Sequence, residues 1–214
     1  MLVEVIQKRV KNFFTSKEGS HDWYHIERVW KLSLHIHQKE GGNREIVELC
    51  ALLHDVSDHK FNGGDFELGG SVARQWVLDS GGSLETADKV GFIVPQISFK
   101  GALVKDTELP IEGLIVRDAD RLDAIGAIGI ARAFAYGGSK NRPLFDPKTK
   151  PEMHSSKEAY LESRSHTVNH FYEKLLRIKD RISTKTAKNV AQRRHLYMEG
   201  YLKQFYDEWN VNLD

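Results

Sequence analysis

Apolar residues recur along most of this chain at the three- and four-residue spacing of amphipathic helices. The pattern predicts helices over about 2–14, 22–38, 44–56, 68–79, 84–97, 111–136, 156–179 and 184–209. No segment shows the sustained alternation of apolar and polar residues that is typical of a strand. We therefore predict an all-α fold, with breaks or kinks near Pro95 and near Gly126.

Two segments depart from simple amphipathicity. The predicted helix at 44–56 is apolar on nearly all sides, which indicates a buried helix. Residues 137–154 contain three of the five prolines and no apolar period. A loop of this length in a compact domain is often a functional lid, although an ordinary surface loop is the alternative. We expect one domain over 1–214, with this lid-like loop followed by C-terminal helices from about 156.

Composition and charge narrow the function classes. The 214 residues include 31 Lys+Arg and 30 Asp+Glu, giving a net charge of +1. A general nucleic-acid binder usually carries a larger basic excess, so we expect no stable nucleic acid complex. No signal-peptide pattern and no apolar stretch of about 20 residues occurs, so we expect a cytoplasmic protein without membrane contact. The single Cys50 excludes an internal disulfide and a cysteine-based zinc site.

The chain contains ten histidines, and histidine is the commonest metal ligand in proteins. His25 shares a predicted helix face with apolar residues, and His54 and Asp55 end the buried helix. A third, otherwise apolar helix carries three carboxylates, at Asp118, Asp120 and Asp123. Because buried carboxylates need partners, one divalent cation bound by all three segments would satisfy these groups together. Imidazole and carboxylate ligands suit manganese, iron, nickel or zinc, and the residues alone leave the choice of aspartate open.

Each of these features also has a structural interpretation. A single buried histidine is more often a hydrogen-bonded core residue than a metal ligand. Arg117 and Arg121 flank the acidic positions and could form a local ion-pair ladder with them. The combination of the three segments, and above all the adjacent His54 and Asp55, favours the metal site.

Long motifs in the chain resemble a known family. The sequences HDWYHIERVW, CALLHDVSDHKF, DADRLDAIGAIGIAR and HSSKEAYLE are similar to blocks of a stand-alone bacterial group within the HD-domain superfamily of metal-dependent phosphohydrolases. The resemblance covers nearly the whole chain and implies an HD-domain helical bundle. It also implies one divalent metal ion held by His25, His54, Asp55 and Asp120. Manganese is the first choice, with magnesium, nickel, iron and cobalt as alternatives.

The same resemblance implies an enzyme that hydrolyses a nucleoside triphosphate to a monophosphate and pyrophosphate. A nucleoside monophosphate phosphatase and a phosphodiesterase are alternatives within the enzyme class. A non-catalytic domain that binds metal or nucleotide as a sensor is the alternative from a different class. A sensor needs no proton-transfer group beside its metal, so such a group would discriminate between the two classes.

Asp58 is the candidate for that group. A nucleotidase subgroup of the superfamily is similar in having an acid three residues after the HD pair, where it transfers a proton; a solvated loop carboxylate is the alternative. His59 and Lys60 follow as further catalytic candidates, through a leaving-group proton or phosphate charge. The candidates for substrate binding are His21, Arg28, Arg121, Lys140 and Arg142.

The remaining histidines and a C-terminal aromatic stripe have simpler interpretations. We expect structural or surface roles for His35, His37, His154, His166, His170 and His195. The stripe of Tyr197, Tyr201, Phe205 and Trp209 could support a homodimer, although such stripes more often belong to the core.

Overall fold

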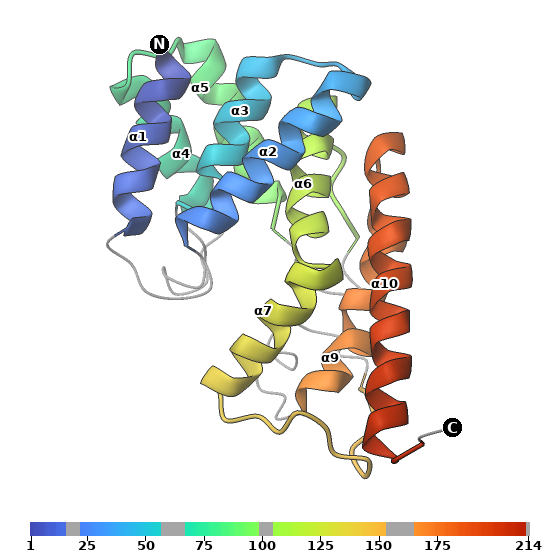
Figure 1. Ribbon diagram of the computed structural model, residues 1–214. Helices are drawn as coiled ribbons and strands as arrows, with labels where there is room; N and C mark the ends of the chain where they lie inside the picture. The colour runs from blue at the N-terminus through green and yellow to red at the C-terminus, as the bar shows by residue number, and fades with distance from the viewer. Residues whose placement is uncertain (16–21, 57–66, 99–104, 153–164, 213–214) are drawn as a thin grey trace. The chain divides into compact units, whose positions relative to one another are not determined.

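The computed structural model describes residues 1–15, 22–56, 67–98, 105–152 and 165–212. Within these ranges the chain forms helices joined by turns and loops, and no strand occurs (Figure 1). The predicted all-α fold class is therefore confirmed. None of the helices in the described ranges combines the length and the apolar character needed to cross a membrane.

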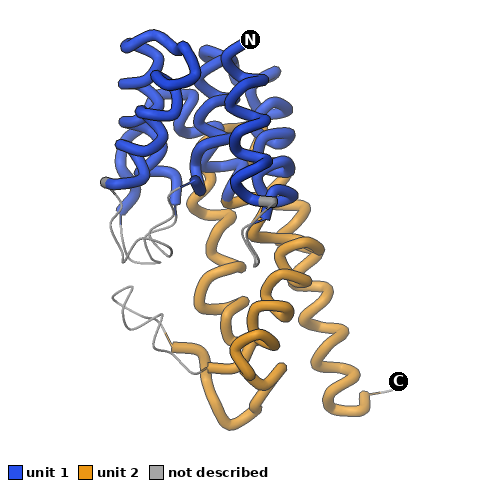
Figure 2. The backbone as a smooth tube through the Cα atoms, turned by 90° about the vertical axis from the view of Figure 1, so that its left-hand side faces the viewer, with its two compact units in different colours: residues 1–99, 105–120 blue, residues 100–104, 121–214 orange. Residues whose placement is uncertain are grey.

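The chain divides into two compact units (Figure 2). The first consists of Met1–Phe99 with Lys105–Asp120, and the second of Lys100–Val104 with Arg121–Asp214. The division falls within the helix Ile111–Asp123, labelled α6, directly after Asp120. The expectation of a single domain over 1–214 stays a prediction.

A helix that is buried along its length forms the centre of the first unit. The helices of this unit are α1 (Leu2–Thr15), α2 (Trp23–Glu40), α3 (Arg44–Leu53), α4 (Glu67–Asp79), α5 (Leu84–Ile93), the short 3-10 helix η1 (Val94–Gln96) and the larger part of α6 (Ile111–Asp123). Helix α3 packs against α1, α2 and α5. Every residue from Ile46 to Leu53 is buried, as the apolar pattern predicts. Each large aliphatic side chain buried here contributes about 1.5–3 kcal/mol of apolar transfer free energy.

Local sequence signals fix several helix ends in this unit. Asp22, Asn43 and Ser83 each accept a hydrogen bond from a backbone N–H of the first turn that follows, and so cap α2, α3 and α5. Helix α5 ends at Ile93, and Pro95 lies in the 3-10 turn that follows it. Proline removes a backbone donor, so the predicted break near this residue is confirmed.

The second unit is built around the long C-terminal helix. It contains α7 (Gly126–Ser139), α9 (Thr167–Glu173), the 3-10 helix η2 (Leu175–Arg181) and α10 (Lys185–Trp209). Helix α10 packs against α7 and η2, and α9 packs against the same two elements.

Aromatic rings fill much of the space between these helices. The rings of Phe171 and Tyr201 stack with centroids 6.0 Å apart, and Phe134 contacts both of them and Phe205. The middle of the predicted aromatic stripe, Tyr201 and Phe205, is therefore half-buried against these rings. Its ends are exposed, Tyr197 to 58% and Trp209 to 45%. The homodimer remains a prediction.

The helix predicted over 111–136 is two helices, α6 and α7. The chain leaves the helical conformation after Asp123, and Gly126 has a φ of +79°. An L side chain is strained at this φ, so glycine is required where the second helix starts. The predicted break near Gly126 is confirmed, and α7 continues to Ser139, beyond the predicted end at Tyr136.

The helix predicted over 156–179 is shorter where the structure describes it. Helix α9 begins only at Thr167, because His166 is its extended N-cap and its Nδ1 accepts a hydrogen bond from the Asn169 N–H. The His166 Nε2–H donates to the carbonyl of Thr149 at 3.1 Å, and the Asn169 amide donates to the same carbonyl. The predicted lid-like loop is therefore tied to α9 at Thr149. Its residues 153 and 154 lie outside the described ranges.

The half-buried position of His170 in the second unit has a consequence for acid stability. Burial, together with the positive charges of Lys174 and Arg142, lowers the pKa of His170 from 6.5 to about 3. The unfolded chain therefore binds a proton below pH 6.5 that the folded chain does not, and stability falls as the pH falls from 6.5 towards 3. Between pH 7 and pH 5 this group alone should lower the free energy of unfolding by about 2 kcal/mol.

The variant His170→Gln should remove that part of the pH dependence. Urea unfolding at pH 7 and pH 5 measures it, with His35→Gln as the control, because His35 is exposed. An unchanged difference between the two pH values in His170→Gln would contradict the assignment.

Candidate metal centre

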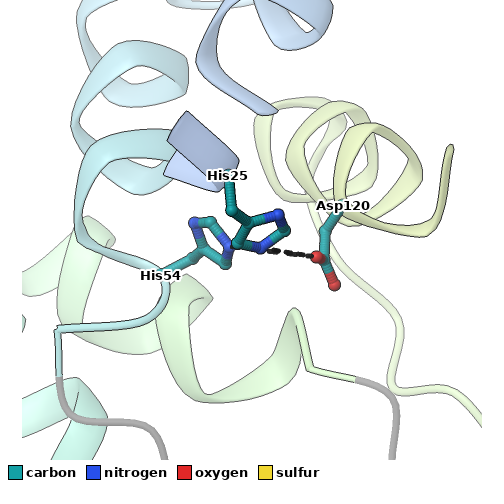
Figure 3. Close-up of side chains that lie close together, drawn as sticks. All are labelled: His25, His54 and Asp120. Carbon is teal, nitrogen blue, oxygen red and sulfur yellow. Dashed lines mark hydrogen bonds and ion pairs between the residues drawn. The ribbon is translucent and has the colours of Figure 1, made fainter. Parts of the chain in front are cut away.

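Side chains from three helical segments of the first unit converge on one point (Figure 3). His25 lies in the first turn of α2, His54 and Asp55 follow the last residue of α3, and Asp120 lies on α6. The Nε2 atom of His25 is 3.3 Å from Nε2 of His54, 3.4 Å from Oδ2 of Asp55 and 3.5 Å from Oδ1 of Asp120. Nε2 of His54 lies 3.7 Å and 3.8 Å from the same two carboxylate oxygens.

Three of the four side chains are almost completely shielded from solvent. Those of His25, His54 and Asp55 are at most 5% exposed, whereas that of Asp120 is 22% exposed. Two carboxylates and two imidazoles with this little solvent need a shared partner, because a buried charge without compensation is costly. Asp120 is thus the most exposed of the four side chains.

A backbone contact fixes the orientation and the tautomer of His54. Its Nδ1 lies 2.8 Å from the carbonyl oxygen of Ala51, which can only accept a hydrogen bond. Nδ1 therefore carries the proton, and Nε2 presents a lone pair towards His25 and the two carboxylates. This is the arrangement in which a histidine binds a metal ion, with its second nitrogen held by a carbonyl.

The donor set fits one divalent cation. The two imidazole nitrogens lie within 4 Å of each other and of an oxygen of each carboxylate, and a shared ion would compensate all four donors. Among the described residues, His25, His54 and Asp120 form the one group of three or more such side chains whose ligand atoms all lie within 4.8 Å of one another. Asp55 is not part of that group, but its Oδ2 lies 3.4 Å and 3.7 Å from Nε2 of His25 and His54. Cys50 is no part of the group; burial raises the pKa of its thiol, so the sulfur stays protonated and a poor ligand.

The two other aspartates of α6 are used differently. Asp123 accepts a hydrogen bond from Nη1 of Arg132 at 2.7 Å, in a nearly buried ion pair of the second unit. Asp118 is fully buried and lies two residues before Asp120, which places it on nearly the opposite side of the helix. Of the three carboxylates, Asp120 is thus the one that lies beside both imidazoles, in agreement with the residue that the family resemblance implies.

The arginines beside these aspartates contact backbone carbonyls. Nη1 of Arg117 donates to Thr107 at 2.8 Å, and Nη1 of Arg121 donates to Arg181 at 2.6 Å. Arg121 is only 2% exposed. Its predicted contact with a substrate stays a prediction.

The remaining candidates fall into three groups. His21, Asp58, His59 and Lys60 lie outside the described residues. Arg28 is half-buried on α2, three residues after His25. Lys140 and Arg142 belong to the second unit, where their cationic groups lie 5.9 Å and 5.7 Å from the ring centroid of the exposed Tyr136. Roles in catalysis or substrate binding stay predictions for all of them.

Comparison with known proteins gives a consistent result. Residues 22–125, which include all four converging side chains, match the HD domain family. The Bacillus subtilis protein YpgQ is 38% identical over 203 residues, which is 94% of this chain and 90% of YpgQ.

Two solved structures extend the comparison. An HD-superfamily hydrolase from Bacillus thuringiensis is 42% identical, with a TM-score of 0.77 over 97% of this chain and 96% of that one. The structure of Bacillus subtilis YpgQ in complex with ADP has 34% identity and a TM-score of 0.77, over 97% of this chain and 94% of that one.

Proposed function

Because this chain belongs to the HD-domain superfamily of metal-dependent phosphohydrolases, we propose that it hydrolyses nucleoside triphosphates to nucleoside monophosphate and pyrophosphate. The convergence of His25, His54, Asp55 and Asp120 is the observation that carries the proposal, since it supplies the donors for a divalent ion. The relative YpgQ has been solved in complex with ADP, which supports a nucleotide as the substrate class. We expect the reaction in the cytoplasm, on free nucleotides.

The four converging side chains would hold the ion, and we propose Mn²⁺ as its identity. A divalent ion supplies an activated water and polarises a phosphoryl oxygen, which permits attack on phosphorus at neutral pH. His54, with its Nδ1–H on the Ala51 carbonyl, contributes a fixed lone pair. Asp55 and Asp120 supply two negative charges, so a bound Mn²⁺ is neutralised and the substrate's charge must be met by other groups.

We assign those other groups from the sequence. Asp58 would exchange a proton with the attacking water or the leaving group, and His59 would assist it. The candidates for contact with the phosphate groups are Lys60, His21, Arg28, Arg121, Lys140 and Arg142. Net charge of +1 over the chain gives no general attraction to polyphosphate, so local cations must provide it.

Product analysis across a panel of nucleotides tests the proposal. Purified protein with Mn²⁺ should release pyrophosphate and a monophosphate from a nucleoside triphosphate, and chelation of the ion should stop the release. The panel should include ribose and deoxyribose forms of each base, and Mg²⁺, Ni²⁺, Fe²⁺ and Co²⁺ in place of Mn²⁺. Anion-exchange chromatography separates the products.

The other functions give different products. Orthophosphate released from monophosphates alone would indicate a nucleoside monophosphate phosphatase. Cleavage of diester substrates alone would indicate a phosphodiesterase. Binding of metal and nucleotide without turnover of any compound would indicate a sensor.

A further inference from the structure

The turn between α2 and α3 contains two glycines with positive φ values and is closed by side-chain hydrogen bonds. Gly41 and Gly42 have φ values of +82° and +89°, a region that L side chains rarely adopt. Nε2 of His37, on the last turn of α2, lies 3.1 Å from the Gly42 carbonyl, and Asn43 caps α3 through its side chain. The two helices that carry His25 and His54 are therefore joined by a connection with little freedom.

The start of α6 lies directly against this turn. Glu112, in the first turn of α6, accepts a hydrogen bond through Oε1 from the backbone N–H of Asn43 at 2.7 Å. A Cβ atom added to Gly42 would lie 2.9 Å from Cγ2 of Ile111 and 3.1 Å from Oε1 of Glu112, so a side chain here would crowd both residues. A charge-assisted hydrogen bond of this kind is stronger than a neutral one.

The three helices that meet at this turn are the three that contribute metal ligands. Asp120 lies eight residues after Glu112 on α6, which is about 12 Å along a helix. His54 and Asp55 come at the opposite end of α3 from Asn43. A small tilt of α6 at Glu112 would therefore shift the Asp120 carboxylate relative to the two imidazoles. Metal sites tolerate only a few tenths of an ångström of such displacement.

We propose that Glu112 is a positioning residue for the metal centre. Its carboxylate ties the N-terminal end of α6 to the α2–α3 turn, and thereby sets the distance from Asp120 to His25 and His54. Glu112 itself touches neither the ion nor the substrate. The inference rests on the proposed metal site. It makes metal affinity depend also on Glu112, whose hydrogen-bond partner Asn43 lies 69 positions earlier in the chain.

Affinity for Mn²⁺, measured by calorimetric titration of the metal-free protein, tests the inference independently of turnover. We expect Glu112→Ala to weaken binding by about tenfold, the lower end of the effect of outer contacts on metal sites. Glu112→Gln should stay within about twofold of the wild type, because its amide oxygen can still accept from Asn43. Glu85→Ala is the matched control, since Glu85 also lies in the first turn of a helix of the same unit but accepts its hydrogen bond from the exposed Lys89 of its own helix.

The outcomes separate the two proposals. Equal affinities in Glu112→Ala and Glu85→Ala would overturn the positioning role. Mn²⁺ binding by the wild type without nucleotide turnover would overturn the proposed function and leave the positioning role standing, whereas no Mn²⁺ binding by the wild type would overturn both. Circular dichroism checks folding. Should Glu112→Ala not fold, Glu112→Asp withdraws the carboxylate by one methylene group, and wild-type affinity in that variant would overturn the inference.

Discussion

The double replacement of His54 and Asp55 by alanine is expected to abolish Mn²⁺ binding and nucleotide hydrolysis together. It removes two of the four converging donors, one imidazole nitrogen and one carboxylate oxygen. The two that remain, on His25 and Asp120, lie 3.5 Å apart and would offer the ion one neutral and one charged ligand. Loss of binding should exceed 100-fold, since loss of a contact that only orients a ligand already costs about 10–100-fold.

Calorimetric titration with Mn²⁺ and a pyrophosphate-release assay measure the two effects in the same preparation. His35→Ala is the control, because His35 is an exposed histidine on the helix that carries His25. It should leave both quantities unchanged. Activity that survives in the double variant would refute the assignment of these residues to a catalytic metal.

Replacement of Asp58 by asparagine is expected to separate binding from chemistry. Asparagine keeps the size of the side chain but cannot exchange a proton, so kcat should fall by about 10²–10⁴-fold. The affinity for Mn²⁺ should stay within about twofold of the wild type, because Asp58 is not among the proposed metal ligands. This split distinguishes a proton-transfer group from a ligand, whose loss would lower both.

The rate should be measured at saturating Mn²⁺ and across pH. With Asp58 as the proton-transfer group, the wild-type profile of kcat against pH has a limb that is absent in Asp58→Asn. Asp180→Asn is the control, an exposed aspartate of the second unit. A wild-type kcat in Asp58→Asn would show that Asp58 transfers no proton and is a solvated loop carboxylate. The argument against a sensor, which depends on a proton-transfer group beside the metal, would then be lost.

Fold class and the burial of α3 could be predicted from the sequence, because both depend on local periodicity. An apolar pattern on all sides of 44–56 favours a helix that is buried on all sides. Helix ends were predictable where a residue acts through its own backbone, as Pro95 and Gly126 do.

The sequence did not predict a helix boundary that depends on a hydrogen bond to a residue distant in the chain. Helix α9 begins at Thr167 because His166 is held by Thr149, a residue 17 positions earlier. Nothing in the spacing of apolar residues signals this contact. The same contact ties down part of the loop that its prolines and lack of period made a candidate lid.

The site shows the same division. Histidines and aspartates on apolar faces could be chosen from sequence, because their burial calls for a shared partner. The pattern of residues alone left the choice between Asp120 and Asp123 open, and only the resemblance to the family pointed to Asp120. The ion pair that Asp123 makes with Arg132 agrees with that choice, and it depends on a contact that the pattern does not show. The acceptor for the second nitrogen of His54 could not be predicted at all, because it is the backbone carbonyl of Ala51.

The central position of α3 links metal binding to the stability of the folded protein, and so to its resistance to proteolysis. Since two of the proposed ligands directly follow α3, the buried helix of the first unit, the proposed site is complete only when that unit is folded. An ion that binds only the folded chain stabilises it, by about 2.7 kcal/mol when the free metal is 100 times its dissociation constant. Depletion of the metal would then do more than stop a reaction. It would raise the fraction of chains open to proteolysis, and so couple the abundance of the enzyme to the supply of its cofactor.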